Sequence, residues 1–475
     1  MSQPFPADPF FAGNYAPLTF EADAADLPLR GALPENLTGT LYRNGPNPQF
    51  APRDANHHWF VGDGMIHAFH VAAGRVSYLN RWVRTPKWEA ERAAHKALFG
   101  SWGNPATTDP SVLGKDGGVA NTNIVWHAGR LFALEDAHRP FALDPQTLAA
   151  QGYWDFAGAF KGARFTAHPK IDPETGEMIF FAYSAAGHFT PTLAYGVIDH
   201  TGTLTRYEQF DAPYASMVHD FLVTRNYVLF PVMPLTGSMQ RAMSGKPAYA
   251  WEADRRSYVG VMKRDAAVSS IRWFECDPCY VFHPMNAYED GDKIVGDVMQ
   301  YEAAPLFPDP DGRPGDPAKA VARLTRWTID LAANTDTFKQ ERLDDLAGEF
   351  PRFDERFAGL AYRHGFFAAR GNGNGRGDAF DSDSFDTLAH IDLKTNTRSA
   401  YKLPHGDAVS EPIFVPRSAD APECDGYLLT TIYRGAEHRS DLAVFEATAL
   451  EKGPIAIAEL SHRVPFGFHG NWRPA

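Results

Sequence analysis

Hydrophobic and polar positions alternate in short runs along most of this chain. From about Thr40 onward, brief β-prone apolar runs are separated by turn-forming residues. This pattern is typical of a β-sandwich, barrel or propeller. The clearest example is a hairpin in which the apolar runs 123–126 and 131–134 flank the glycine-containing turn 127–130. The pattern therefore predicts an all-β protein in which helix is rare.

A loose repeat occurs within this pattern. An apolar strand ends on an aspartate, a polar turn follows, and another strand begins, at Asp144, Asp172, Asp199, Asp330 and Asp392. Strand, turn and return strand at spacings of tens of residues are typical of propeller blades, in which each small sheet packs against its neighbours. Aspartate-rich tight turns also occur in other β proteins, so the repeat favours a propeller without requiring one.

Four segments interrupt the β pattern. Residues 88–98 are helix-prone, residues 231–250 form an apolar Met-rich insertion, 304–318 carry five prolines, and 369–383 are rich in Gly, Asn and Asp. None has the composition of an inter-domain linker. We therefore expect residues 1–475 to form a single domain.

Charge and cysteine usage exclude several classes of function. The formal net charge is -13 and no block of Lys and Arg occurs, which argues against a nucleic-acid partner. The three cysteines, Cys276, Cys279 and Cys424, are too few to cross-link a secreted chain of this length. The chain lacks a secretory-type N-terminus and a membrane-spanning apolar run. These features predict a cytoplasmic protein.

Histidines carry the clearest chemical signal, because Walker, G-x-S-x-G and H-E-x-x-H motifs are absent from the sequence. Four histidines close apolar, strand-like runs: His168, His219, His283 and His469. Others lie in polar, turn-like stretches where solvated imidazole is the default interpretation: His57, His58, His138, His188, His200, His364, His405 and His438. The pair Cys276 and Cys279 has redox or half-zinc-site spacing, but no second pair accompanies it.

An all-imidazole site suits zinc, copper or iron, and the residues alone do not rank these metals. Ligating imidazoles also need an outer acceptor for the second ring N–H, and candidate carboxylates are Asp136, Glu349 and Glu411. The competing interpretation is that each histidine is an ordinary core residue with satisfied hydrogen bonds. The residues by themselves indicate a β-rich metalloprotein.

At these positions the chain resembles the carotenoid cleavage oxygenase family, non-haem iron enzymes that split alkenes with dioxygen. Residues 41–48 and 58–65 look like the N-terminal signatures of the family. The four histidine segments, residues 349–352, residues 411–417 and the C-terminal residues 469–472 follow in the family's order. The resemblance covers nearly the whole chain.

The resemblance implies a seven-bladed β-propeller, with helical and loop insertions capping one face and Fe(II) on its axis. The ligands would be His168, His219, His283 and His469. The family's outer glutamates map onto Glu349 and Glu411, and the third maps onto Asp136, where most members carry Glu. Neighbouring Glu135 is the alternative for that third position. Thr122 matches a family threonine near the open iron position.

The resemblance also bears on the substrate. Phenol-specific members bind the 4-hydroxyl with a tyrosine and a lysine, whereas this chain has Trp102 and Glu135 (or Leu134) at those positions. A carboxylate would repel a phenolate by about a few kcal/mol at moderate effective dielectric. We therefore expect Phe60, Trp102 and Glu135 to line a pocket for an apocarotenoid, which dioxygen would cleave to two carbonyl products.

Alternatives remain open beside that expectation. Residues 217–258 resemble isoeugenol-type members, which favours a phenylpropanoid alkene of the lignostilbene or isoeugenol type. A catalytically inactive propeller that acts as a binding module is an alternative of a different class. The predicted partners are dioxygen and a lipophilic or aromatic alkene. The Met-rich segment 231–250 either makes a peripheral membrane contact or packs over the propeller face, since Met side chains fill irregular gaps.

Overall fold

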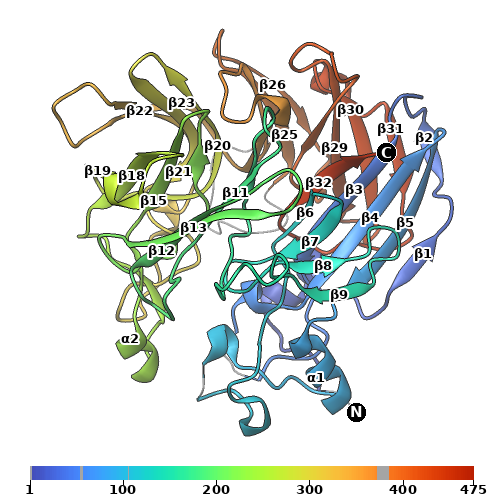
Figure 1. Ribbon diagram of the computed structural model, residues 1–475. Helices are drawn as coiled ribbons and strands as arrows, with labels where there is room; N and C mark the ends of the chain where they lie inside the picture. Colours follow the sequence, from blue (N-terminus) through green and yellow to red (C-terminus); the bar gives the residue numbers. More distant parts are fainter. Residues whose placement is uncertain (1–2, 54–56, 105, 372–384) are drawn as a thin grey trace. The chain divides into compact units, whose positions relative to one another are not determined.

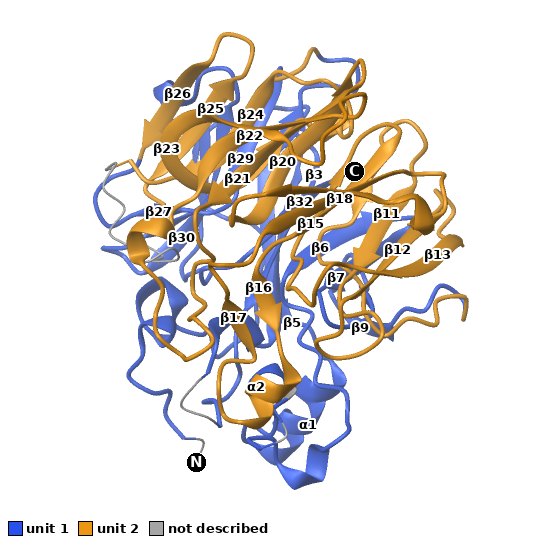
Figure 2. Cartoon of the chain, turned by 90° about the vertical axis from the view of Figure 1, so that its left-hand side faces the viewer, with its two compact units in different colours: residues 1–157, 403–421, 425–475 blue, residues 158–402, 422–424 orange. Residues whose placement is uncertain are grey.

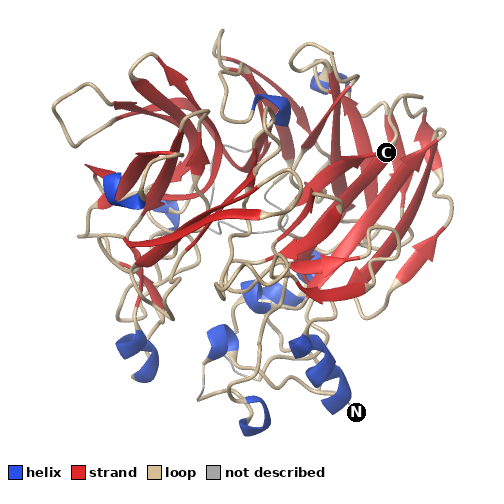
Figure 3. Cartoon of the chain, viewed as in Figure 1, coloured by secondary structure: helices blue, strands red, loops and turns tan. Residues whose placement is uncertain are grey.

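The computed structural model describes residues 3–53, 57–104, 106–371 and 385–475. Strands dominate it (Figure 3), which confirms the prediction of a mostly β protein. Among the described residues the α-helices are α1 (Pro86–Ala94) and α2 (Met239–Met243), and short 3-10 helices occur in the connections. In the part of the chain that is described, no helix has the length and apolar character needed to cross a membrane.

Local signals account for the position of α1 within the predicted helical stretch. The Thr85 side chain accepts a hydrogen bond from the Trp88 backbone N–H, and Pro86 occupies the first turn. Both are favoured at helix N-termini. The helix ends at His95, whose left-handed backbone (φ 52°) forms the C-cap. The helix therefore begins and ends earlier than residues 88–98.

The chain divides into two compact units (Figure 2), each built from antiparallel sheets. Unit 1 contains residues 1–157, 403–421 and 425–475, and unit 2 contains residues 158–402 and 422–424. The single-domain prediction for residues 1–475 stays a prediction. Each unit is described by itself below.

The described residues of unit 1 form three sheets, whose strands are labelled in Figure 1. The first has the order β1 (Ala22–Ala24), β5 (Arg75–Trp82), β4 (Gly64–Ala72), β3 (Gly39–Pro46) and β32 (Gly470–Pro474). The second has the order β2 (Leu29–Gly31), β31 (Ala456–Glu459), β30 (Arg439–Glu446), β29 (Gly426–Arg434) and β27 (Ala408–Val409), with β28 (Ile413–Pro416) also on β29. The third has the order β6 (Asn123–His127), β7 (Arg130–Leu134), β8 (Phe141–Leu143) and β9 (Ala150–Tyr153).

The two ends of the chain share sheets in unit 1. β32 pairs with β3, and β31 pairs with β2, so N-terminal and C-terminal strands are hydrogen-bonded neighbours. Side chains of the first two sheets, among them Leu41, Phe69, Leu429 and Leu442, form one buried core. This closure fixes the C-terminal segment that carries His469.

The predicted hairpin is present as β6 and β7. Its register pairs Asn123 with Leu134 and His127 with Arg130, which leaves Ala128 and Gly129 as the turn. Both residues have positive φ, 47° and 77°. Such a two-residue turn matches the right-handed twist of the flanking strands, and glycine favours it.

The described residues of unit 2 form four sheets. The first has the order β10 (Lys170–Ile171), β11 (Met178–Ala182), β12 (Thr192–Ile198) and β13 (Leu204–Asp211), and the second has the order β14 (Leu222–Val223), β15 (Tyr227–Val232), β18 (Ser257–Lys263) and β19 (Arg272–Cys276). The third is the hairpin of β16 (Leu235–Gly237) and β17 (Tyr249–Trp251). The fourth is β20 (Tyr280–Asp290), β21 (Lys293–Tyr301), β22 (Arg323–Asp330), β23 (Lys339–Phe353), β24 (His364–Ala369), β25 (Thr387–Asp392), β26 (Thr397–Lys402). β23 pairs with β22 through its first half and with β24 through its second.

The repeated aspartates act as the sequence pattern indicates. The Asp144 carboxylate accepts the backbone N–H groups of Gln146 and Thr147, at 3.0 and 2.8 Å. The same turn recurs at Asp172, Asp199, Asp330 and Asp392. Each aspartate therefore ends a strand by offering the next peptide groups a local acceptor.

The other segments that interrupt the β pattern have mixed outcomes. Residues 231–250 are not one insertion, because they contribute to four elements: the end of β15, all of β16 and α2, and the start of β17. Residues 304–318 form a connection with one short 3-10 helix, Pro317–Lys319, at its end. Most of 369–383 lies outside the described residues.

Candidate metal centre

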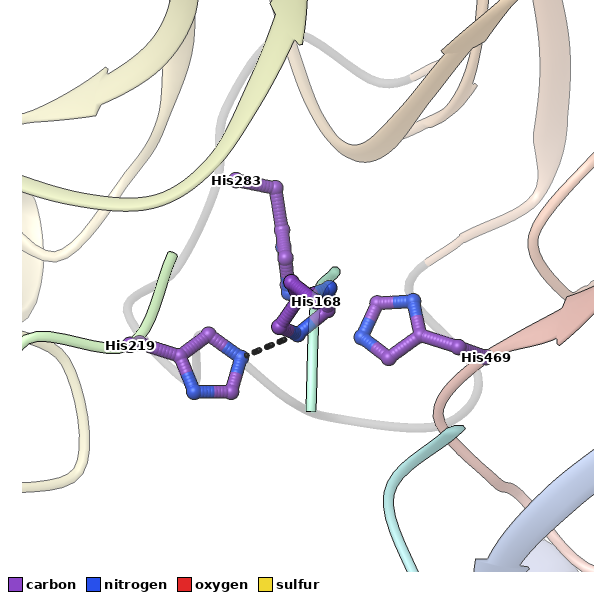
Figure 4. A group of neighbouring side chains, drawn as sticks. All are labelled: His168, His219, His283 and His469. Atoms are coloured by element: carbon purple, nitrogen blue, oxygen red, sulfur yellow. Dashed lines mark hydrogen bonds between the residues drawn. The ribbon is translucent and has the colours of Figure 1, made fainter. Parts of the chain in front are cut away.

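Three of the four predicted histidines converge in unit 2. His168 and His219 lie in the connections before β10 and β14, and His283 lies in β20 where the strand register shifts between Val281 and Pro284. Such a bulge re-aims the side chain that it carries. One nitrogen of each of these imidazoles lies within 4.8 Å of the others, and their rings point toward one another in Figure 4.

The shortest of these contacts is suited to a shared cation. The Nε2 atoms of His168 and His219 are 2.9 Å apart. Two metal–nitrogen bonds of about 2.0–2.1 Å at a right angle would place their nitrogens about 2.9 Å apart. Imidazole nitrogens without a sulfur ligand suit iron, zinc or copper. The donor set in unit 2 therefore fits a transition-metal ion.

A carboxylate holds the far side of His283. Glu349 Oε2 accepts the His283 Nδ1–H at 2.6 Å and the Phe350 backbone N–H at 2.7 Å, and Oε1 accepts the Tyr301 hydroxyl at 2.9 Å. Burial, together with the charge of Glu349, raises the pKa of Tyr301 well above its ordinary value, so the phenol keeps its proton and donates. With Nδ1 fixed in this way, Nε2 of His283 is the nitrogen left to face an ion.

His168 has a carboxylate neighbour that the sequence interpretation missed. Asp220 Oδ2 lies 3.7 Å from His168 Nδ1, and Asp220 Oδ1 accepts Lys170 Nζ at 2.7 Å and the Phe221 N–H at 2.7 Å. Burial raises the pKa of Asp220, an effect that the positive charge of Lys170 opposes. Asp220 adjoins His219 in sequence, and that position beside a candidate ligand was the available signal.

His469 has the same kind of surroundings in unit 1. Its Nδ1 lies 2.9 Å from Glu411 Oε1, while Glu411 Oε2 accepts the Gly470 N–H at 2.8 Å. Arg43 Nη1 lies 3.4 Å from that same oxygen and Nη2 donates to the Phe468 carbonyl at 3.1 Å. Glu411 is therefore a fully engaged, buried carboxylate that fixes the tautomer of His469.

Thr122 is tied directly to His469. The His469 backbone N–H donates to the Thr122 carbonyl at 3.2 Å, and the Thr122 hydroxyl donates to Asn121 Oδ1 at 2.9 Å. Asn121 in turn donates to the carbonyls of Phe60 and Gly62, both at 2.7 Å. This chain of bonds connects the predicted pocket residue Phe60 to the segment that carries His469.

Asp136 and Glu135 are the two candidates for the third outer carboxylate, and the contacts of Glu135 suggest another role. Glu135 Oε1 pairs with His138 Nδ1 at 2.8 Å and accepts the Val119 N–H at 2.9 Å. Burial alone would raise the pKa of Glu135, but His138 and the backbone N–H groups outweigh it and lower the pKa. Glu135 therefore orients His138, which argues against it as the alternative. Asp136 is half-buried beside it, and its role stays a prediction.

The predicted pocket residues Phe60 and Trp102 meet in an aromatic cluster of unit 1. Their rings are 6.5 Å apart, His58 lies 4.5 Å from Phe60 and 5.2 Å from Trp102, and Phe468 lies 5.3 Å from Phe60. Burial lowers the pKa of His58 to about 3. His58 is half-buried rather than fully solvated, and burial together with neighbouring His57 keeps the imidazole neutral. The cluster includes the residue that precedes His469.

A mostly β fold in which imidazoles are held by buried carboxylates is compatible with a metal centre that has histidine ligands. The chain matches the family described as retinal pigment epithelial membrane protein over residues 15–474 and belongs to it. This is the carotenoid cleavage oxygenase family that the sequence resembles.

Individual relatives share most of their length with this chain. Isoeugenol monooxygenase of Pseudomonas nitroreducens is 42% identical over 483 residues, covering 98% of each protein. The crystal structure of Pseudomonas brassicacearum lignostilbene dioxygenase is 38% identical, covers 100% of both chains and has a TM-score of 0.95. A variant of Synechocystis apocarotenoid oxygenase is 28% identical, covers 97% of this chain and 98% of that one, and has a TM-score of 0.86.

The protein is therefore an oxygenase that cleaves a carbon–carbon double bond oxidatively. Its relatives are named monooxygenases and dioxygenases, and they differ in the alkene that their names give. The alternative of an inactive binding module is set aside.

Proposed function

We propose that His168, His219, His283 and His469 together bind Fe(II). The observation that supports a common role is the repeated outer arrangement: Nδ1 of His283 meets Glu349 in unit 2, and Nδ1 of His469 meets Glu411 in unit 1. In both cases Nε2 is the remaining donor. When bound, the iron supplies the redox chemistry by which dioxygen attacks the alkene.

The proposed scaffold is a seven-bladed propeller. The described residues form six antiparallel sheets of four or more strands. The long strand β23 divides the seven-stranded sheet β20–β26 into two strand groups, so this sheet would supply two blades and the other five sheets one each. The pairing of β3 with β32 would close the ring of blades, as mixing of N- and C-terminal strands does in propellers.

The chain's own residues contribute positioning rather than acid–base catalysis. Glu349 and Glu411 fix the orientation of two imidazoles, and we assign Asp136 as the third outer carboxylate. Thr122 braces the His469 backbone. The aromatic cluster of Phe60, Trp102 and Phe468 offers an apolar surface that excludes water and holds a planar alkene.

The proposed substrate is a phenylpropanoid alkene of the isoeugenol or lignostilbene type. One observation carries this choice over an apocarotenoid: the Glu135 carboxylate, which would repel a phenolate if it faced the substrate, is already bound to His138 and to the Val119 N–H. Glu135 therefore has hydrogen-bonding partners of its own. The 42% identity with isoeugenol monooxygenase supports the same choice.

An apocarotenoid is the second candidate. It is favoured by the absence of the tyrosine that phenol-specific members use, since Trp102 occupies that position and makes an edge-on contact with Phe60 and a tilted one with His58 rather than offering a hydroxyl. The likeness to apocarotenoid oxygenase, at 28% identity, is consistent with it.

Incubating Fe(II)-loaded protein separately with isoeugenol, a hydroxystilbene and an apocarotenal tests the choice. We expect aldehydes from the phenolic alkenes and no fragment from the apocarotenal. A His283→Ala variant serves as the control for metal-dependent turnover. Cleavage of the apocarotenal alone would refute the phenylpropanoid assignment and restore the pocket argument from Trp102.

A further inference from the structure

A second group of metal-ligating side chains lies elsewhere in unit 2. His364 is the first residue of β24, His390 lies in β25, and Cys424 belongs to the short segment 422–424 that the connection between β28 and β29 contributes to this unit. One ligand atom from each lies within 4.8 Å of the others. None of the three takes part in the oxygenase chemistry described above.

The sheet register explains why the two imidazoles meet. His390 pairs with Phe366 and His364 pairs with Asp392, so the two histidines are diagonal neighbours on one face of the β24–β25 pair. Their rings lie 5.1 Å apart at an angle of 29°. His364 lies in a polar stretch of the sequence and is half-buried here.

The segment that carries Cys424 is anchored to the same strand end. Glu423 Oε1 accepts the backbone N–H groups of Arg363 and His364, at 2.7 and 2.8 Å. Cys424 itself has a left-handed backbone (φ 68°) and is 1% exposed. A non-glycine residue in this conformation costs about 1–2 kcal/mol, so the fold holds the thiol here against a local preference.

The distances are close to those of a tetrahedral zinc site. His364 Nδ1 lies 3.0 Å from His390 Nε2, and Cys424 Sγ lies 3.9 Å from His390 Nε2. Zinc bonds of about 2.0–2.1 Å to nitrogen and about 2.3 Å to sulfur, at tetrahedral angles, would give about 3.3–3.4 Å and about 3.5–3.6 Å. Each observed distance differs from the ideal by about 0.3–0.4 Å, a shift that side-chain rotation supplies.

An outer partner orients one of these imidazoles. His390 Nδ1 lies 3.2 Å from the Ser399 hydroxyl of the adjacent strand β26. The Phe366 ring stacks on the His390 ring, with 5.1 Å between the ring centres. Engagement of Nδ1 leaves Nε2 as the nitrogen that faces His364 and Cys424. The two histidines are half-buried, so an ion has access from solvent, and three protein ligands leave a fourth position for water.

We propose that His364, His390 and Cys424 form a zinc site that joins the 422–424 segment to the β24–β25 sheet. Two imidazoles and one thiolate are a ligand set that zinc accepts, and the thiolate distinguishes this site from the all-imidazole centre. The bound ion would cross-link parts of the chain that are far apart in sequence, and its binding energy would add to folding stability.

Cobalt(II) added alone to the metal-free full-length protein tests this proposal. A thiolate ligand gives cobalt(II) a sulfur-to-metal charge-transfer band in the near ultraviolet, which an all-histidine centre does not give. We expect the band in the native protein, its loss in Cys424→Ser, and its displacement by Zn²⁺. The matched control is the Cys276→Ser/Cys279→Ser variant, which removes the other two thiols, 3.9 Å apart and also buried, and should keep the band.

A graded variant makes the test independent of whether Cys424→Ser folds. Removing the outer hydroxyl in Ser399→Ala should weaken cobalt binding at this site about 10–100-fold. Absence of the band from the native protein would overturn the proposal and leave a plain hydrogen bond between His364 and His390. Loss of the band in the Cys276→Ser/Cys279→Ser control would overturn it equally, because the thiolate would then belong to that pair.

Discussion

Replacing Glu349 by glutamine removes one negative charge from the proposed iron centre and almost nothing else. The glutamate is 1% exposed and its two oxygens accept from His283, Phe350 and Tyr301. Glutamine has nearly the same volume. Its carbonyl oxygen can serve His283 and Phe350, and its amide N–H can donate to the Tyr301 hydroxyl, which rotates to accept.

The loss is therefore that of charge assistance to the His283 hydrogen bond. A bond to a charged group contributes about 1.5–3 kcal/mol, against about 0.5–1.5 kcal/mol for a neutral one. The difference of about 1–1.5 kcal/mol corresponds to about a 5–13-fold weaker metal affinity, at the low end of the roughly 10–100-fold that altering an outer partner usually costs. We expect iron affinity to fall by that factor while the melting temperature of the metal-free protein changes little.

Anaerobic competition between the protein and a chelator for Fe(II) measures this affinity. Tyr301→Phe is the matched control, because it removes the bond to Glu349 Oε1 and leaves the His283–Glu349 contact in place. We expect a loss of less than about threefold in that variant, since only a neutral donor disappears. Native affinity in Glu349→Gln, or equal losses in both variants, would refute the role of Glu349.

Three further predictions follow from other contacts. Glu411→Gln should weaken iron binding and also destabilise the metal-free protein by about 1–3 kcal/mol, because Arg43, whose side chain is 3% exposed, loses its charged partner. Chemical denaturation measures the second effect, and a metal-free variant as stable as the native protein would contradict it. Burial holds the pKa of His58 near 3, below its ordinary 6.5, so the free energy of unfolding is highest above pH 6.5 and falls as the pH drops from there. Lowering the pH from 7 to 5 should therefore cost the native protein about 1–2 kcal/mol more than it costs His58→Asn. Equal losses in the two proteins, measured by denaturant titration, would contradict this. If α2 contacts membranes, the native protein should float with phosphatidylcholine vesicles and Met239→Ser/Met243→Ser should not, since the two methionine side chains are 48% and 73% exposed. A native protein that stays at the bottom of the gradient while the vesicles float would refute the contact.

Local sequence signals predicted the elements that depend on neighbouring residues. The Asp144 and Asp172 turns, the β6–β7 hairpin and the helix at α1 each rest on contacts within a few residues of chain. Short-range hydrogen bonds fix such elements, so the residue order alone is sufficient. The prediction that four histidines end strands is wrong in this respect, because His168 and His219 lie in connections, His283 lies within β20 and His469 precedes β32.

Contacts across the sheets were beyond the reach of that reasoning. Asp220 adjoins His219 in sequence, but only the fold brings its carboxylate to His168 and Lys170. Glu135 was placed in a pocket from the family resemblance, which stays a prediction, and the structure adds its contact with His138. Polarity of the flanking residues likewise predicted solvent around His58, which aromatic rings instead surround.

His364 and His390 show why this second kind of contact is hard to predict. They are 26 residues apart, and their proximity depends on the β24–β25 register being the one observed, because a slip of one residue would move one imidazole to the opposite face. Cys424 then reaches them only because Glu423 binds the strand end. A search of the sequence for metal motifs finds no such site, since its three ligands come from three separate elements and share no spacing rule. The register and the Glu423 anchor are thus the physical basis of the proposed zinc site.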